Sequence, residues 1–289
     1  MKIDPEEFRV REGKKPDLSR HATRTKPLYA SKSAYEAQLQ KEVLRLADLQ
    51  DCLYADNRYA LLVIFQAMDA AGKDGAIKHV FSGINPQGVR VTSFKHPSEQ
   101  ELEHDFMWRI YPCLPEHGHI GVFNRSYYEE VLVVRVHPEI LAMQNLPHGL
   151  KPGNSLWKQR YSSMRSLERH LRASGTHVVK FFLNVSKEEQ RKRLLARLDE
   201  PEKNWKFQEG DLKERTFWKD YMRAYEDCLG ATSTRDAPWY VVPADDKQNA
   251  RLIVAKILAQ TLSGMKPAYP EVGETRRGEL LAMREQLQK

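Results

Sequence analysis

A lysine in a turn of small residues, directly after an apolar run, is the group with the clearest chemistry in this sequence. The run Leu-Leu-Val-Ile-Phe at 61–65 leads into Gln-Ala-Met-Asp-Ala-Ala-Gly-Lys-Asp-Gly at 66–75, and a helix-like segment follows. Such a turn directs consecutive backbone N–H groups toward one point at the positive end of a helix, which is how proteins hold phosphate oxygens. Lys73 adds a full positive charge there. The sequence therefore predicts a phosphate-binding loop at 67–75.

This loop departs from the usual pattern of Gly, four residues, Gly-Lys and then Ser or Thr. Ala67 stands in the first glycine position, Gly72 and Lys73 are in place, and Asp74 replaces the hydroxyl residue that normally contacts magnesium. Asp69, inside the loop, offers a carboxylate that could hold the metal instead, because magnesium prefers oxygen ligands. The alternative is an ordinary strand-turn-helix with a surface lysine, but packing alone does not require this acid beside a Gly-Lys pair.

The composition is that of a globular chain, for which we expect no membrane partner. Its 289 residues, 41% hydrophobic and 29% charged, suffice for one large α/β domain or two small ones. No apolar run approaches the ~20 residues of a membrane span, and residues 1–7 lack the apolar core of a signal peptide. Cys52, Cys113 and Cys228 are far apart with no Cys-x-x-Cys, which predicts free thiols in a reducing, cytoplasmic compartment.

The charge balance favours an anionic ligand. Lys and Arg number 46 against 39 Asp and Glu, a net charge of +7. This excess suits nucleic acid, nucleotides or an inorganic phosphate polymer, without choosing among them. Because the sequence shows no pattern of aromatic residues typical of an RNA-binding sheet, we expect no nucleic acid partner.

Strand-like and helix-like segments alternate through the middle of the chain. The expected strands are 59–66, 89–94, 119–124, 176–185 and 239–243, and the expected helices are 74–83, 98–112, 154–173, 186–198, 211–229 and 247–263. This alternation predicts a three-layer α/β fold with a central parallel sheet and helices on both faces. In such sheets ligands bind beyond the carboxyl ends of the strands, where the phosphate loop lies.

The chain divides into three parts. Residues 1–30 form a polar arm that either packs on the surface or stays loose, 31–263 form a single P-loop kinase-like domain, and 264–289 form a tail with a short charged helix. A capping-box pattern at Ser33 opens a long helix before the core, and a second one at Ser186 opens the helix after the fourth strand.

A second group of polar residues follows the third strand. Arg125 comes directly after it, where a planar guanidinium could neutralise a phosphoryl group in transfer. Asn124 occupies a position where phosphate-loop enzymes commonly carry a metal-organising acid, and it could orient Arg125 or accept from metal-bound water. Glu129 and Glu130 follow on a turn, and for Glu130 a solvated acidic turn is the simpler interpretation. Lys95, at the end of the second strand, lies on the same edge and could reach an acceptor phosphate.

The segment of about 191–211 is dense in cations. Arg193 and Arg197 are four residues apart and share a helix face. Lys203 and Lys206 follow in the next loop. The position after the fourth strand and its helix predicts a helical lid that closes over phosphates and excludes water, and the alternative is a solvated basic face.

These pieces, in this order, resemble the family-2 polyphosphate kinases over roughly 35–263. The matching stretches are Ala-Met-Asp-Ala-Ala-Gly-Lys-Asp-Gly at 67–75, Phe-Asn-Arg-Ser-Tyr-Tyr-Glu at 123–129, Arg-Leu-Asp at 197–199, Lys-Asn-Trp-Lys at 203–206 and Ala-Pro-Trp-Tyr-Val-Val-Pro-Ala at 237–244. Most of that family has Asp at the position of Asn124 and Asn at that of Glu129. The combination seen here, followed by Val-Leu-Val-Val-Arg-Val at 131–136, looks like the class III branch, which is associated with phosphorylating both nucleoside monophosphates and diphosphates.

The resemblance implies transfer of the terminal phosphoryl of inorganic polyphosphate to AMP, giving ADP, and to ADP, giving ATP. It implies that Asp69, Lys73 and Arg125 are catalytic, and that Asp69 anchors Mg²⁺ or Mn²⁺. The implied polyphosphate-binding residues are Ala70, Ala71, Gly72, Lys73, Asp74, Arg197, Lys203 and Lys206, and the implied nucleotide-binding residues are Lys95, Asn124 and Glu129. It also implies a homo-oligomer, either a dimer or a tetramer.

Two other functions remain open from the residues. One is an ATP-dependent kinase of nucleotides or small molecules, against which the missing Ser or Thr after Lys73 argues. The other is a non-catalytic protein that binds polyanions, against which Asp69 argues, because a carboxylate does not help a pure anion cradle.

Overall fold

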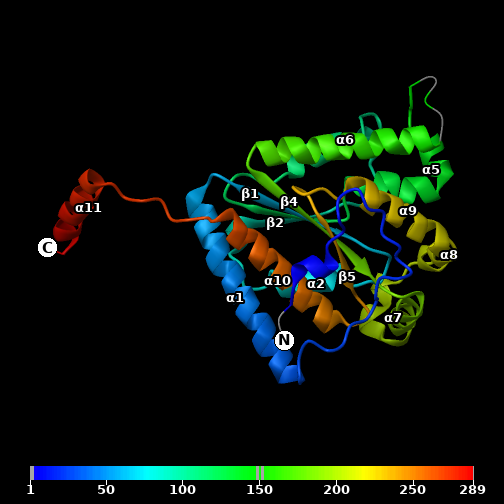
Figure 1. The fold of residues 1–289 in the computed structure, drawn as a ribbon, viewed down its shortest axis with the longest axis horizontal. Helices are drawn as coiled ribbons and strands as arrows, with labels where there is room; N and C mark the ends of the chain where they lie inside the picture. Colours follow the sequence, from blue (N-terminus) through cyan, green and yellow to red (C-terminus); the bar gives the residue numbers. More distant parts are fainter. Residues whose placement is uncertain (1–2, 148–149, 151–152, 289) are drawn as a thin grey trace.

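The core of the structure, a computed structural model that describes residues 3–147, 150 and 153–288, is a parallel sheet between two layers of helices (Figure 1). In the described residues the sheet has five strands in the order β2-β3-β1-β4-β5, all parallel. They are β1 (Ala60–Gln66), β2 (Val89–Ser93), β3 (Ile120–Asn124), β4 (Thr176–Asn184) and β5 (Trp239–Pro243). The predicted α/β fold and its five strands are confirmed.

Strand β1 lies in the middle of the sheet, and all seven of its residues are buried. A strand covered on both faces and paired on both edges reads as an unbroken apolar run, which is why the sequence shows it so clearly. Phe65 in β1 pairs in register with Asn124 in β3 and Phe181 in β4. The segments that follow β1 and β3 therefore leave the sheet side by side.

Helices cover both faces of the sheet. In Figure 1 helices α1, α2 and α10 lie on one side of the strands, and α6 and α9 lie on the other. The longer helices are α1 (Lys32–Asp56), α2 (Lys73–Val80), α6 (Asn154–Ala173), α7 (Lys187–Asp199), α9 (Trp218–Thr232), α10 (Lys247–Met265) and α11 (Glu274–Leu287). The shorter ones are α3 (Glu99–Leu102), α4 (Val133–Val136), α5 (Pro138–Ala142) and α8 (Gly210–Thr216), with 3₁₀ turns η1 (Pro5–Phe8), η2 (Pro86–Gly88), η3 (Trp108–Cys113), η4 (Tyr127–Val131) and η5 (Pro201–Lys206).

The helix predicted at 98–112 is wrong. The structure has only α3 and the 3₁₀ turn η3, separated by an irregular stretch. Asp105 explains the break, because its side chain accepts from the N–H of Met107 and its carbonyl accepts from the N–H of Trp108. Local bonds of this kind compete with the helical pattern.

Two further helix boundaries differ from the prediction. The helix predicted at 211–229 is two helices, α8 and α9, that meet at Phe217, whose ring packs edge-on against His137 with centroids 4.9 Å apart. The N-cap of α1 lies two residues earlier than predicted, since Ser31, and not Ser33, accepts from the N–H of Ala34.

The N-terminal arm packs against the body along its described length. Val10 and Leu18 are buried, and the N–H of Val10 donates to the carbonyl of Trp239 in β5. Farther along, the N–H of Leu28 donates to the side chain of Asn249 in α10. The C-terminal helix α11 projects away from the body, has no buried residue and ends near the C label in Figure 1. Within the described parts of the chain, none of the helices combines the length and the apolar character needed to span a bilayer.

Candidate active site

The predicted phosphate loop is an open turn between β1 and α2. Ala70 and Gly72 have left-handed backbones, with φ of +59° and +108°, and Gly72 is the N-cap of α2. A Cβ at Gly72 would lie 3.7 Å from the nearest atom, in Arg193, so the backbone conformation and not the available space calls for glycine. The N–H groups of Ala70, Gly72 and Lys73 have no hydrogen-bond acceptor among the described residues. The loop therefore offers free donors at the positive end of a helix.

Lys73 follows Gly72 as the first residue of α2. Its side chain is buried, and Nζ donates to the carbonyl of Ala67 at 3.0 Å. Burial, followed by the nearby Arg125 cation, lowers the pKa of the Lys73 ammonium. No carboxylate of the described residues lies within ion-pair distance of it. A buried cation without a bonded anion is costly, so a phosphate at this point would stabilise it.

Arg125 connects the two predicted groups of site residues. It follows β3 with a left-handed backbone, φ +64°, held by a bond from its N–H to the carbonyl of Phe65. Its guanidinium donates to Asp69 Oδ1 at 2.9 Å. Neighbouring Glu129, and to a lesser extent Asp69, raises the pKa of Arg125. The predicted catalytic residues Asp69, Lys73 and Arg125 thus lie together.

The predicted nucleotide-binding residues lie at the same edge. Burial raises the pKa of the Glu129 carboxyl, while the cations Arg125 and Lys73 oppose that shift. The side-chain amide of Asn124 donates to Asp74 Oδ1 at 2.7 Å. The neutral Asn124 therefore supplies a hydrogen-bond donor to Asp74, the acid that replaces the usual Ser or Thr of the loop.

The oxygen atoms of the site are compatible with magnesium. The described residues contain no group of three or more His, Cys, Asp or Glu side chains arranged to hold a metal by themselves. Magnesium usually takes one or two carboxylates and completes its shell with water and substrate phosphates. Asp69 is a suitable carboxylate, because 29% of its side chain is exposed, which leaves room for water and phosphate oxygens around a bound ion.

A cavity of about 160 Å³ is lined by Arg125 and Glu129 and by no residue of the phosphate loop. Lys95 also lines this cavity, and its binding of a nucleotide stays a prediction. Further polar side chains, among them Arg109, Glu130 and Gln144, line it as well, and its apolar lining comes from Phe94, Pro97, Leu102, Phe106, Val133, Val134, Ile140 and Met143. A larger, open hollow of about 850 Å³, lined by Tyr54, His117 and His119 among others, lies at the amino ends of the strands and includes no residue of the phosphate loop.

Glu130 is not part of a solvated turn, so that interpretation was wrong. Its carboxylate is buried and pairs with Arg160 of α6 at 3.0 Å, and Gln144 donates to the same oxygen at 2.8 Å. The 3₁₀ turn η4 points Glu130 inward against α6, and turn geometry of this kind is not visible in a short polar sequence. Glu130 also borders the 160 Å³ cavity.

The predicted lid is formed by the end of α7, by η5 and by α8. Its cations bond within the lid: Arg197 donates to Asp211 at 3.0 Å and to the carbonyl of Lys206 at 3.1 Å, and Lys203 pairs with Glu200. The Lys206 ammonium lies 5.0 Å from the centre of the Trp205 ring. Binding of polyphosphate by these three cations stays a prediction.

Comparison with known proteins decides the family. A family profile described as "Polyphosphate kinase 2 (PPK2)" matches residues 29–270. The chain belongs to the polyphosphate kinase 2 family. The resemblance of the sequence to this family is confirmed, while its assignment to the class III branch stays a prediction.

Similar members of the polyphosphate kinase 2 family cover most or all of this chain. The "ADP-polyphosphate phosphotransferase" of Rhodopseudomonas palustris is 62% identical over 289 residues, which is 100% of both chains. The "AMP/ADP-polyphosphate phosphotransferase" of Meiothermus ruber is 48% identical over 227 residues, 78% of this chain and 80% of that one. The crystal structure of polyphosphate kinase 2 from Arthrobacter aurescens TC1 matches with a TM-score of 0.87 at 40% identity, over 97% of this chain and 96% of that one.

Two side chains contact the phosphate loop in a way that the sequence did not predict. Gln190 in α7 donates from Nε2 to the carbonyl of Asp69 at 2.9 Å. Arg193, one turn later, donates from Nη1 to the carbonyls of Ala70 and Ala71 at 3.2 and 2.7 Å. Arg193 stood out only as one cation among many, and Gln190 gave no signal, because the sequence does not show which face of α7 turns inward.

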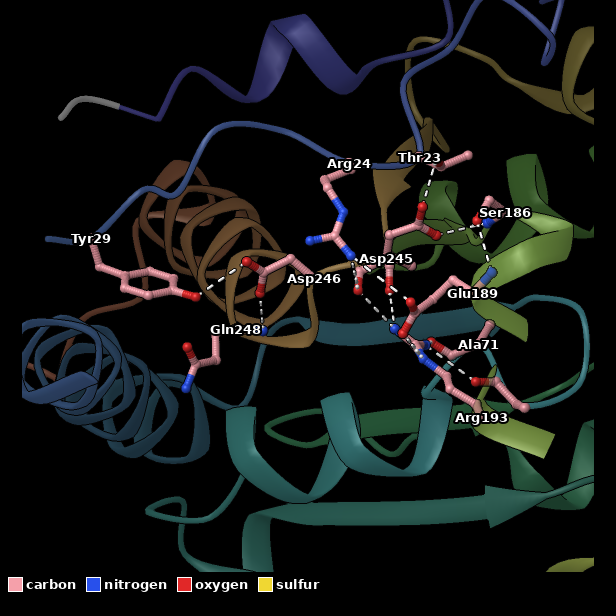
Figure 2. A network of polar contacts seen from close by, with 12 residues as sticks. Thr23, Arg24, Tyr29, Ala71, Ser186, Glu189, Arg193, Asp245, Asp246 and Gln248 are labelled. Carbon is pink, nitrogen blue, oxygen red and sulfur yellow. Dashed lines mark hydrogen bonds and ion pairs between the residues drawn. The ribbon is translucent and has the colours of Figure 1, made fainter. Parts of the chain in front are cut away.

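Arg193 also joins the loop to the carboxyl end of β5 and, through it, to the N-terminal arm (Figure 2). Its Nη2 donates to the carbonyls of Ala244 and Asp245 at 2.6 and 3.1 Å. The Asp245 carboxylate accepts from Thr23 Oγ1 at 2.8 Å and from the N–H of Ser186, the N-cap of α7, at 2.7 Å. The phosphate loop, α7, the end of β5 and the arm are therefore held together by one network.

Proposed function

We propose that this chain transfers the terminal phosphoryl group of inorganic polyphosphate to nucleoside monophosphates and diphosphates, forming ADP from AMP and ATP from ADP, with Mg²⁺ or Mn²⁺. One observation carries the proposal: two different binding sites meet at Arg125. On one side lie the free amides and Lys73, which suit the end of a phosphate chain. Arg125 also lines a cavity that combines charged groups, such as Lys95 and Glu129, with apolar side chains, which suits a nucleotide.

The reaction demands little acid–base chemistry from the protein. An acceptor phosphate is already ionised at neutral pH, so no strong general base is needed. The protein has to align two anions that repel each other and to neutralise charge on the group in transfer. Lys73 and the loop amides hold the donor end, and Arg125, between the loop and the cavity, binds the moving phosphoryl group.

The acceptor occupies the cavity with its phosphates toward Arg125. Lys95 supplies a second cation in the lining of the cavity. The Glu129 carboxylate stabilises the charged form of the Arg125 guanidinium, because it raises the pKa of Arg125. The apolar lining receives the base, where hydrophobic contact adds affinity without marked selectivity between similar rings.

Asp69 is the residue that would hold the metal ion. In the structure its Oδ1 is engaged by Arg125, while the carboxylate remains partly open to solvent. A bound Mg²⁺ supplies charge neutralisation for the donor and acceptor oxygens. Asp69 and Arg125 together would then fix the position of the metal ion relative to the phosphoryl group.

A donor and acceptor exchange tests the proposal. Purified protein with Mg²⁺ and long-chain polyphosphate is offered AMP and ADP separately, and products are followed over time by chromatography. We expect ADP and then ATP from AMP, ATP from ADP, and loss of turnover on chelation of the metal. Turnover with ATP as donor but not with polyphosphate would establish the nucleotide kinase instead, and metal-independent binding of polyphosphate without turnover would establish a binding protein.

The proposal includes a homo-oligomer, dimer or tetramer, in the cytoplasm. The three cysteines are free, with Cys228 buried and the other two half-buried, which suits a reducing compartment. Light scattering coupled to size exclusion measures the mass of the assembly, and a monomer of 33.6 kDa at assay concentration would exclude this part of the proposal.

A further inference from the structure

Three consecutive carbonyl groups of the phosphate loop are held by two side chains of one helix. Gln190 binds the carbonyl of Asp69, and Arg193 binds those of Ala70 and Ala71. The two residues are three positions apart and therefore share a face of α7. Both are buried, with 1% and 8% of their surface exposed, so water does not readily replace these bonds.

Peptide geometry connects these carbonyls to the phosphate-binding amides. In a planar trans peptide the C=O of one residue and the N–H of the next point in opposite directions. Fixing the carbonyls of Asp69 and Ala71 toward α7 therefore turns the N–H groups of Ala70 and Gly72 away from it. These are two of the N–H groups without an acceptor among the described residues. The N–H between them, that of Ala71, makes a long turn bond of 3.3 Å to Met68.

The two side chains are themselves fixed. Arg215 of α8 donates to Gln190 Oε1 at 2.7 Å, which leaves the amide nitrogen of Gln190 facing the loop. Arg193 Nε donates to Glu189 at 2.9 Å, and Nη2 is occupied by the carbonyls of Ala244 and Asp245. Because protein acceptors already occupy all three nitrogens of this guanidinium, it is not available to grip a phosphate chain.

We propose that Gln190 and Arg193 are positioning residues that orient the backbone amides for polyphosphate without touching it. The inference rests on the proposed function, because it takes the phosphate loop to be the polyphosphate site. It also assigns the N-terminal arm a part in that site. Thr23, which holds Asp245 behind Arg193, precedes residue 29, where the family match begins.

Equilibrium binding of inorganic tripolyphosphate, measured by calorimetry without nucleotide, tests the proposal. Gln190→Met removes one neutral bond to the loop, so we expect affinity to fall about 2- to 10-fold. Arg193→Lys keeps the charge but loses the planar fork, so we expect a fall of about 10- to 100-fold. The KM for AMP stays at the wild-type value in both variants. Lys187→Met is the matched control, since Lys187 is an exposed cation at the start of the same helix, and we expect wild-type affinity.

Salt dependence separates positioning from direct contact. A cation that binds phosphate directly releases a counterion, so its removal lowers the slope of log affinity against log salt by about one. For Arg193→Met we expect weaker binding with an unchanged slope. A slope lower by about one would show direct contact and overturn the proposal for Arg193. Thermal unfolding of each variant establishes that the protein measured is folded, and Gln190→Met, which conserves volume, tests the proposal independently of Arg193.

Tripolyphosphate binding by Lys73→Ala distinguishes failure of the proposed function from failure of the positioning role. If Lys73→Ala binds tripolyphosphate as tightly as the wild type, the loop is not the polymer site and the proposed function fails with the inference. If Lys73→Ala weakens binding while Gln190→Met and Arg193→Lys do not, the proposed function stands and the positioning role is refuted.

Discussion

Replacing Lys180 by Met should destabilise the protein severely through a charge left alone in the core. Lys180 lies in β4, is completely buried, and donates from Nζ to Glu168 at 2.7 Å, to the Tyr128 hydroxyl at 2.9 Å and to the carbonyl of Thr232 at 2.8 Å. Glu168, 2% exposed, also accepts from the hydroxyls of Tyr127 and Tyr128. Burial lowers the pKa of Lys180, and the Glu168 carboxylate opposes that shift.

The size of the effect follows from this geometry. Met has a similar length but cannot balance the Glu168 charge, and removing one partner of a buried ion pair costs about 3–5 kcal/mol. With an unfolding entropy of about 2.1 cal/mol/K per residue, this lowers the Tm of a chain of this length by about 5–8 °C. An exposed pair gives the contrast: Lys32 and Glu36 are 82% and 60% exposed, so Lys32→Met should change stability by less than about 1 kcal/mol.

A double-mutant cycle in urea measures the coupling. Lys180→Met, Glu168→Gln and the double variant are unfolded alongside the wild type. We expect the double variant to recover most of the loss of Lys180→Met, because the Gln side chain is neutral and still accepts from the tyrosines. Strictly additive losses, or a loss below about 1 kcal/mol in Lys180→Met, would refute the reasoning.

Three further predictions concern the site. Asp69→Asn and Lys73→Ala should each lower turnover with polyphosphate and AMP, followed by chromatography, at least ~100-fold, the scale of losing one key electrostatic group, and near-normal turnover in either would contradict the assignment. Burial raises the pKa of Glu129, so this carboxyl ionises at a higher pH than an ordinary Glu. If the ionised form is active, kcat/KM rises with pH through that raised pKa, and Glu129→Gln should remove this part of the acid limb; an unchanged profile would exclude the role. Asn124→Asp would place a second carboxylate against Asp74, and without metal the repulsion between the two would lower the stability of the fold by about 1–4 kcal/mol. The Tm measured in chelator should therefore fall, and half-saturation by Mg²⁺ should move to lower concentration. Equal Mg²⁺ dependence in both proteins would count against a metal at this edge.

The parts of the site that sequence reasoning reached are those encoded over a few neighbouring residues. The apolar strand β1, the small-residue turn and Lys73 are contiguous, and a parallel sheet brings the end of β3, with Arg125, to the same edge. This is why the α/β fold and its five strands were predicted correctly, while the order of the strands in the sheet was not predicted.

The parts that were missed depend on how distant elements face each other. The bonds from Gln190 and Arg193 to the loop require the orientation of α7 about its own axis, and neither residue has a local pattern that fixes it. The apolar cavity is built partly from the stretch where Asp105 interrupts the expected helix. A side chain that bonds to its own backbone neighbours changes the path of the chain, and periodicity does not report it.

The arm bonded to Asp245 has a consequence for how the protein is made. Thr23 leaves the ribosome early, while its acceptor Asp245 and the Asn249 amide that holds Leu28 emerge more than 200 residues later. These hydrogen bonds, which support the phosphate loop from behind Arg193, can therefore form only when synthesis is nearly finished. Until then the phosphate loop of a nascent chain lacks the contacts that link it, through Asp245, to the N-terminal arm. Chains that end before β5 would never form these contacts.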